Sequence, residues 1–503
     1  MKNYVNLNWT EKLNGTAKAV WNENRAPFLS ALLVGLAAHG YAFGNKLLNH
    51  DEIESLFGKG ATVTSGRWGL ELVKILFPDW SMPWIYGLLS LLLIALSCCF
   101  MMKMLDIRST ALRIFLPALI VSFPSLTGTF CFMFTAPAYA WSFFLTTLAV
   151  FLLQREKWQA ALLAVPLLIL ALGIYQAYIS LAASLCIVLM IQDTLKGEKP
   201  VDRIIRFGVK ALALLLLSVA LYYAVTRLVL LVTGAAFNDY VTENVNGAVS
   251  IPRRVRMAYD AFFYIFSFRN FYIISSEFSR ILHIILGVLL LASLGYLALR
   301  GKKPLHALLL GVLLCLLPLS ICCMFLIMSQ ESIHTLVMYS FVTVYLLMGL
   351  AAERIGFRPL NLLLSAALAV IVLGNVYFAN MCYLKMELQY ENARSFYTTL
   401  LTRVQSSEGF DESCSLAIIG RQENLLHSFP ELDTELFMGV NRELVNIYSR
   451  ENLIRFYLGQ DISFADEESI GRLEDDPRVA EMAEYPYDGS VRKIDNMIVV
   501  KLG

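Results

Sequence analysis

The first two hydrophobic segments of the chain are separated by the sequence NKLLNHDEIESLFGKGATVTSGRWGLELVKILFPDW, which covers residues 45–80. It is the longest polar passage between hydrophobic segments in the first two hundred residues, and its acidic cluster of Asp51, Glu52 and Glu54 directly follows the first hydrophobic segment. Because carboxylates avoid the interior of a bilayer, this cluster is expected at a membrane surface, where it faces water and a lipid-borne substrate together. We therefore expect the chemistry of this protein to take place in this passage.

The composition is that of a polytopic membrane protein. Hydrophobic residues make up 57% of the 503 residues and charged residues 16%, against about 25% charged residues in soluble domains. A hydrocarbon core about 30 Å thick requires roughly 20 apolar residues per helix. This length predicts about eleven transmembrane helices, near residues 27–45, 83–103, 112–128, 137–153, 159–174, 178–192, 208–231, 281–299, 305–327, 334–352 and 361–379. The first follows a polar segment and lacks a small-residue cleavage site, so it is expected to remain as a span.

Lysine and arginine residues are distributed unevenly between the loops. They occur in each predicted inner segment, whereas the short loops near residues 129–136, 175–177 and 328–333 carry none. Because positively charged loops stay in the cytoplasm, this pattern predicts the N-terminus inside and the Asp51 loop outside. Residues 1–403 have a formal net charge of +12 and residues 404–503 of −11. We therefore predict a transmembrane domain over residues 1–403 and a small acidic extracytoplasmic domain over residues 404–503.

The C-terminal hundred residues have the pattern of a small α/β fold. Residues 415–419 and 497–500 are short β-type runs, Asp488-Gly489 is a turn signal, and residues 441–458 have apolar positions at helical spacing. The nine cysteines of the chain show no metal-ligand spacing, so neither a zinc site nor a disulfide framework is expected.

Two longer segments are predicted on the outer side. In residues 46–82, apolar positions at helical spacing predict an amphipathic helix over residues 66–77 that ends at Pro78 and lies on the membrane interface. Residues 233–280 mix arginines with aromatic side chains. This mixture suits a surface that binds a lipid phosphate, and it equally suits an aromatic belt with basic anchors.

Three motifs follow one another in order along the chain. They are the acidic pair Asp51-Glu52 after the first span, GRWGL at residues 66–70, and YQAYIS at residues 175–180. In this pattern, which covers the membrane part and most specifically residues 45–180, the chain resembles the bacterial glucosyltransferases that modify O-antigens during phage serotype conversion. That family belongs to the GT-C class of integral-membrane glycosyltransferases.

The resemblance implies a GT-C-like fold and an inverting transfer of a sugar, commonly glucose, from a polyprenyl-phosphate carrier. The acceptor would be a hydroxyl of a cell-envelope glycan, such as an O-antigen or a teichoic acid. The implied location is the outer face of the bacterial cytoplasmic membrane, with the lipid bilayer, a separate donor-synthesising enzyme and a flippase as partners. No cofactor and no nucleic acid are expected, and metal dependence stays open.

The resemblance also assigns catalysis to an acidic residue in the first outer loop, which is Asp51 or its neighbour Glu52 in this chain. A carboxylate there acts as a general base on the incoming hydroxyl. We favour Asp51 as the base with Glu52 beside it, and Glu54 as a solvated or supporting group. The departing phosphate requires fixed positive charge, for which the planar guanidinium is suited. The candidates on the outer side are Arg67, Arg253, Arg254 and Arg256.

Further candidates for contact with the substrate lie in the later motifs. Trp68 belongs to the predicted interfacial helix, and Tyr175, Gln176 and Tyr178 lie at a turn between two spans. Tyrosines at this depth also serve as interface anchors, whereas an amide such as that of Gln176 suits a hydrogen bond to a sugar hydroxyl. His334 is on the outer side too, although a lone histidine at a span boundary is more often structural.

Two other functions fit part of this pattern. A transporter or flippase of a lipid-linked sugar also needs many spans and a phosphate site, but it calls for polar residues at mid-membrane depth and repeat symmetry, neither of which is evident. A non-enzymatic envelope assembly protein would depend on the acidic C-terminal domain more than on Asp51.

Overall fold

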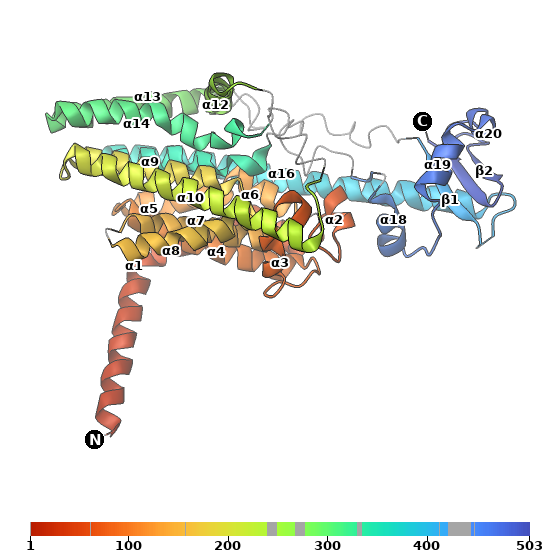
Figure 1. The fold of residues 1–503 in the computed structure, drawn as a ribbon, viewed down its shortest axis with the longest axis horizontal. Coiled ribbons are helices and arrows are strands. Elements are labelled where there is room, and N and C mark those ends of the chain that lie inside the picture. The colour runs from red at the N-terminus through yellow and green to blue at the C-terminus, as the bar shows by residue number, and fades with distance from the viewer. Residues whose placement is uncertain are drawn as a thin grey trace.

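The structure is a computed structural model that describes residues 2–60, 62–155, 157–238, 249–266, 277–328, 334–411, 413–420, 444–446 and 448–502. A bundle of long, roughly parallel helices makes up most of the molecule, and a small domain lies beyond one end of it (Figure 1). One long helix, α16 (Arg358–Gln405), connects the two parts, and the N-terminal half of α1 (Lys2–Gly44) projects from the opposite end of the bundle.

The described residues include nine helical segments long and apolar enough to cross a membrane, which confirms the polytopic helical class. They lie in α1, α16 and seven other segments, namely α4 (Pro83–Met104), α7 (Ala136–Leu153), α9 (Tyr178–Lys196), α10 (Val201–Thr233), α13 (Glu277–Gly301), α14 (Pro304–Ile321), and η4 (Thr335–Phe341) with α15 (Val342–Ile355).

The remaining two predicted spans are also helical. α5 (Thr110–Ser122) and α6 (Pro124–Phe130) form a pair bent by 45°, which counts as a tenth span if it crosses the membrane as one unit. The bend lies at Phe123, whose ψ of 138° is extended because a residue that precedes proline avoids the helical region. The predicted span at residues 159–174 is α8 (Trp158–Ile174), an apolar helix of 17 residues.

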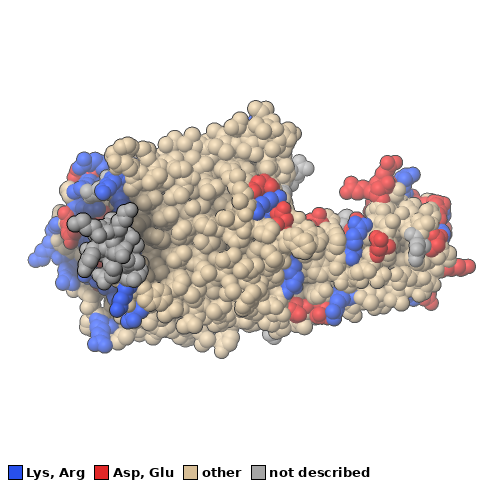
Figure 2. All heavy atoms as spheres, turned by 90° about the horizontal axis from the view of Figure 1, so that it is seen from below, with Lys and Arg blue, Asp and Glu red and all other residues tan. Residues whose placement is uncertain are grey.

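Charged side chains are separated along the bundle. On the face drawn in Figure 2, a broad band without charged residues covers the bundle, and lysine and arginine side chains gather at the end far from the small domain. Most of the visible aspartate and glutamate side chains lie at the other end and on the small domain. This separation agrees with the charge asymmetry of the sequence.

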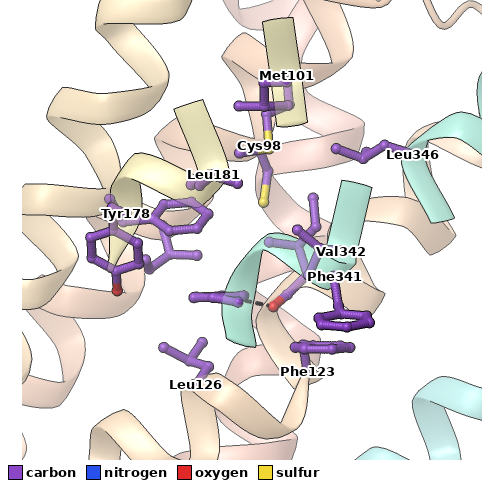
Figure 3. Packing of buried hydrophobic residues seen from close by; sticks show 14 of the residues in the cluster. Cys98, Met101, Phe123, Leu126, Tyr178, Leu181, Phe341, Val342 and Leu346 are labelled. Carbon is purple, nitrogen blue, oxygen red and sulfur yellow. Dashed lines mark hydrogen bonds between the residues drawn. The ribbon is translucent and has the colours of Figure 1, made fainter. Parts of the chain in front are cut away.

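The core of the bundle lies where α4, the bent α5–α6 pair, α9 and the η4–α15 segment meet. Side chains from all four converge there, among them Cys98, Phe123, Leu181 and Val342, none of which exposes more than 1% of its surface (Figure 3). Close packing of this kind is what holds helices together in a bilayer, where the lipid is as apolar as the side chains.

The small domain is built on a three-stranded sheet in the order β1-β3-β2. β1 (Ser415–Ile419) pairs in parallel with β3 (Met497–Lys501), and β2 (Val491–Ile494) pairs antiparallel with β3. The predicted runs at 415–419 and 497–500 are therefore strands, and Gly489 makes the expected turn before β2 with a φ of +87°. The helices α19 (Glu467–Glu474) and α20 (Pro477–Ala480) complete the α/β fold.

Of the helix predicted over residues 441–458, the structure describes only part. That part contains α18 (Arg450–Asn452) and one π-helical turn, Leu453–Tyr457, while residues 441–443 and 447 lie outside the described residues.

α16 ties the small domain to the bundle. Its 48 residues extend about 70 Å at 1.5 Å per residue, more than twice the thickness of a bilayer core. The last turns of α16 share a hydrophobic core with the small domain, and Leu48 and Ile53 from the acidic passage belong to the same core. The sequence boundary at residue 403 thus falls inside α16, and the acidic passage packs against both parts of the molecule.

Candidate active site

The acidic cluster forms a short helix, α2 (His50–Glu54), whose start is fixed by Asn49. The Asn49 Oδ1 atom accepts a hydrogen bond from the Glu52 N–H at 2.8 Å, and its Nδ2 donates to the Cys131 carbonyl at 2.5 Å. An asparagine three residues before a glutamate is a helix-start signal, so this cap was readable from the sequence. The cap orients the acidic residues and attaches α2 to the bundle.

The Glu52 carboxylate is completely buried and serves the interior of the protein. It accepts hydrogen bonds from the Lys46 ammonium, from the Ser81 hydroxyl and, at 3.1 Å, from the Phe134 N–H. A buried carboxylate is tolerated when charge and hydrogen bonds compensate it, as these three donors do. Glu52 therefore joins the start of the loop, the end of the loop and the α6–α7 turn.

Asp51 lies on a different, more exposed face of α2. Its side chain is 45% exposed, it accepts a hydrogen bond from the Tyr448 hydroxyl at 3.2 Å, and its Oδ1 lies 3.6 Å from His50 Nε2. Two neighbouring residues on a helix point about 100° apart. Asp51 is thus the member of the pair that is open to an external molecule.

Glu54 and Lys59 complete the surroundings of α2. Glu54 accepts a hydrogen bond from Asn452 Nδ2 at 2.9 Å, and partial burial raises the pKa of its carboxyl group. The Lys59 ammonium is buried and donates to the Phe134 carbonyl at 2.9 Å and to the Pro78 carbonyl at 3.3 Å. Burial lowers the pKa of Lys59 to about 8.

Arg67 is held by two tyrosines. Its Nη1 donates to the Tyr139 hydroxyl at 3.2 Å, and its guanidinium lies 5.5 Å from the centroid of the Tyr175 ring. The two tyrosine rings stack on each other with centroids 4.2 Å apart. Because residues 131–139 also supply the partners of Asn49, Glu52 and Lys59, this segment supports both the acidic helix and the arginine.

The predicted amphipathic helix is shorter than the sequence suggested. Only α3 (Gly69–Val73) is α-helical, preceded by Gly66 with a φ of +72° and followed by turns. Leu72, Ile75 and Leu76 expose 50%, 84% and 62% of their surface, as expected for residues that contact the membrane interface.

Trp68 packs against α8 and α10, and Gly69 packs against α8. Trp68 Nε1 donates to Thr226 Oγ1 at 3.1 Å, and a Cβ on Gly173 would lie 2.6 Å from the Trp68 ring. A Cβ on Gly69 would lie 2.7 Å from the carbonyl carbon of Gly173. The two glycines thus allow the loop to approach the helix closely.

Gln176 fastens the same loop from the other side. Its Nε2 donates to the Ser65 carbonyl at 3.2 Å and to the Tyr222 hydroxyl at 2.8 Å, and Tyr222 donates in turn to the Gly66 carbonyl at 3.0 Å. Through these bonds the amide holds residues 65–66 in place beside Arg67.

Tyr178 and His334 lie further inside. Tyr178 exposes 3% of its surface and packs edge-on against Phe143 and Tyr175. His334 exposes 9% and directly precedes η4, while residues 329–333 lie outside the described residues.

The arginines predicted to bind a lipid phosphate belong to α12 (Ile251–Phe266). Arg254 donates to the carbonyls of Val249 at 2.8 Å and Leu326 at 3.0 Å, so it anchors the helix. Arg253 and Arg256 are exposed, and Arg256 lies 3.5 Å from the exposed Asp260. Figure 1 shows α12 on the opposite flank of the bundle from α3.

An open groove of about 500 Å³ lies where the bundle meets the small domain. Lys46 and Ser81, which hold Glu52, line it together with Trp84 and Ile85 from the start of α4 and Tyr457 from the small domain. Within the described ranges, no group of three or more histidine, cysteine, aspartate or glutamate side chains could hold a metal ion.

Comparison with known proteins adds the family. The model of the glucosyl transferase GtrII family matches residues 40–345, which is more than half of the chain. The chain belongs to the GtrII glucosyl transferase family. No significant match was found among curated proteins or solved structures.

The GtrII match confirms the resemblance drawn from the three motifs, and it makes glycosyl transfer the activity of the family to which the chain belongs. The matched region contains α2, Arg67, residues 175–178 and α12, whereas α16 and the small domain lie beyond it.

Sequence reasoning missed several residues of this GtrII chain that build the site. Lys46, Ser81 and Lys59 surround Glu52 and the α6–α7 turn, and Tyr222 holds the loop beside Arg67. Tyr448 reaches Asp51 from 397 positions away. Except for Lys46, which is six positions from Glu52, their partners come from other parts of the chain, so no local pattern marks them.

Proposed function

We propose that this GtrII family member is an inverting glycosyltransferase that moves a sugar, with glucose as the first candidate, from a polyprenyl-phosphate carrier to a hydroxyl of a cell-envelope glycan. Family membership supports the transfer of a sugar. The observation that carries the site assignment is the contrast between Asp51, which is half-exposed, and Glu52, which is buried and accepts hydrogen bonds from three donors.

The reaction is proposed to take place at the outer face of the bacterial cytoplasmic membrane. α2 lies at the end of the bundle that bears the small domain, far from the end where lysine and arginine gather (Figures 1 and 2). Because basic loops stay in the cytoplasm, the α2 end is assigned to the outside. An enzyme there depends on a separate enzyme that makes the lipid-linked donor and on a flippase that brings it across.

In the proposed mechanism, Asp51 is the general base. As the acceptor oxygen forms a bond to the anomeric carbon, its proton passes to the Asp51 carboxylate, and the bond between that carbon and the phosphate oxygen breaks. The bonding electrons leave with the polyprenyl phosphate, and a single displacement inverts the configuration at the anomeric carbon. A carboxylate in this role contributes about 10²–10⁴-fold to the rate.

Positive charge is proposed to stabilise the departing phosphate. Arg67 is the best-placed candidate, because Tyr139 and Tyr175 hold its guanidinium and the same 131–139 segment supports α2. A preorganised guanidinium binds two phosphate oxygens at little cost in reorganisation. Arg253 and Arg256 on α12 are assigned to the attraction of lipid phosphates at the membrane surface, and Arg254 to the placement of that helix.

The remaining candidates are proposed to act on the substrate through the loop. Trp68, Tyr175 and Gln176 fix residues 65–69, and they thereby determine where the sugar meets Arg67. Tyr178 and His334 are assigned to the wall behind that loop. No cofactor is required by this mechanism, and a metal requirement is a matter for direct measurement.

The assignment is tested by adding polyprenyl-phosphate-[¹⁴C]glucose to native membranes and measuring label in the glycan fraction. Asp51→Asn is expected to lower transfer by about 10²–10⁴-fold, while the neighbouring Glu54→Gln, a matched loss of one carboxylate, retains most activity. Full transfer by Asp51→Asn would overturn the mechanism. A flippase, the alternative, would move the intact labelled carrier across the membrane without a new glycosidic bond.

A further inference from the structure

The small domain covers the acidic helix with several contacts. The Tyr448 hydroxyl donates to Asp51 at 3.2 Å, and Asn452 Nδ2 donates to Glu54 at 2.9 Å. The ring of Phe456 meets that of Phe57 edge-on at 5.3 Å. Beneath these contacts, Leu48 and Ile53 share the hydrophobic core of the small domain and the last turns of α16. The small domain is therefore fixed to the site, not merely tethered beside it.

The contacts of Asp51 are distributed unevenly between its two oxygens. The Tyr448 hydroxyl and His50 Nε2 both lie next to Oδ1, at 3.2 and 3.6 Å. The Tyr448 and His50 rings also pack edge-on with centroids 6.1 Å apart, so they form one unit beside the carboxylate. In the part of the chain that the structure describes, the hydrogen bond from Tyr448 and the closest approach of His50 are thus both at Oδ1.

We propose that Tyr448 is a positioning residue for Asp51, and that the small domain is thereby a working part of the transfer site. This inference rests on the proposed function, in which Asp51 is the base. With the tyrosine donating to Oδ1, the carboxylate has one rotational setting, and Oδ2 is directed to the incoming hydroxyl. A base must lie within hydrogen-bond reach of the proton that it removes, so fixing its rotation raises the fraction of productive encounters.

Tyr448 lies outside the part of the chain that matches the family model. The match to the family model ends at residue 345, and Tyr448 lies in the small domain beyond it. The general base and its positioning group thus come from separate parts of the chain, joined through α16 and the shared core.

Three variants of the full-length protein test the role of the hydroxyl in native membranes with the labelled donor. Tyr448→Phe keeps the ring against His50 and removes only the donor to Asp51. Tyr448→Ala removes both, and Tyr487→Phe, in the same domain with 72% of its surface exposed, is the matched control. We expect Tyr448→Phe to lower kcat about tenfold, with the donor KM within about twofold of the wild-type value and the protein level unchanged. Tyr487→Phe is expected to match the wild type.

The outcomes separate this inference from the proposed function. If Tyr448→Phe transfers at the wild-type rate while Asp51→Asn is inactive, the base assignment stands and the positioning role is wrong. If Tyr448→Ala alone is impaired, the ring serves packing and the hydroxyl has no role in the reaction. Full activity of Asp51→Asn refutes the proposed function itself. A reduced kcat in Tyr448→Phe together with an inactive Asp51→Asn supports both.

Discussion

Neutralising the two neighbouring carboxylates of α2 is expected to have different effects. Glu52→Gln should lower stability, and Asp51→Asn should lower transfer activity. Glu52→Gln replaces an acceptor oxygen by an amide NH₂ group, and Glu52 is completely buried. Of the three donors around it, from Lys46, Ser81 and Phe134, at least one then faces another donor. The change therefore lowers the free energy of unfolding of this end of the molecule.

The magnitude follows from the burial of each partner. Breaking a buried ion pair by removing one member costs about 3–5 kcal/mol. The Lys46 side chain is 26% exposed and can turn partly to water, so the lower end of this range, about 3 kcal/mol, applies to Glu52→Gln. Asp51→Asn removes the charge from a side chain that is 45% exposed, and it is expected to cost less than about 1 kcal/mol.

The two effects are separated by measuring stability and transfer on the same preparations. Apparent melting in mild detergent, followed by fluorescence-detected gel filtration, should show a clear decrease for Glu52→Gln and almost none for Asp51→Asn. Transfer per folded molecule should show the reverse order. The reasoning is refuted if Glu52→Gln has the same apparent melting temperature as the wild type, or if Asp51→Asn melts at a lower temperature than Glu52→Gln.

Further predictions concern the loop that carries Arg67. Gly69→Ala places a Cβ 2.7 Å from the α8 backbone and should cost about 1–3 kcal/mol in apparent stability, whereas Gly311→Ala, with no atom within 4 Å, should not. Arg67→Lys keeps the charge but loses the planar contacts, so transfer should decrease about tenfold, with the exposed Arg206→Lys as control. Because burial lowers the pKa of Lys59 to about 8 from 10.5, the unfolded chain binds more protons between these values. The stability of wild type relative to Lys59→Met should therefore rise with pH, by at most about 1.4 kcal/mol per unit; melting curves from pH 7 to 10 check this.

The elements that the sequence predicted best are those set by local composition. All eleven predicted spans lie on helices, because a run of apolar residues long enough to cross a bilayer has no other stable backbone there. The strands at 415–419 and 497–500 were predicted because each is a short β-type run bounded by polar residues, which is also a local feature of the sequence. The three motifs were sufficient to predict the family, since they depend on residue identity and order alone.

Local pattern was less reliable where the backbone approaches another element. The helix predicted over residues 66–77 is reduced to Gly69–Val73, because Gly66 adopts a left-handed conformation and Gly69 packs directly on the α8 backbone. The sugar contact of Gln176 stays a prediction, and the structure adds that its amide donates to the Ser65 carbonyl and the Tyr222 hydroxyl.

By itself, the sequence determined that acidic residues follow the first span and that Asp51 and Glu52 are neighbours in the chain. Only the tertiary structure decided which of them is buried. Helical geometry separates the two side chains by about 100°, but it does not say which direction is the interior. That depends on Ser81 and Phe134, 29 and 82 positions from Glu52, and on Tyr448, 397 positions from Asp51. Contacts between such distant residues exist only after the bundle and the small domain have packed together.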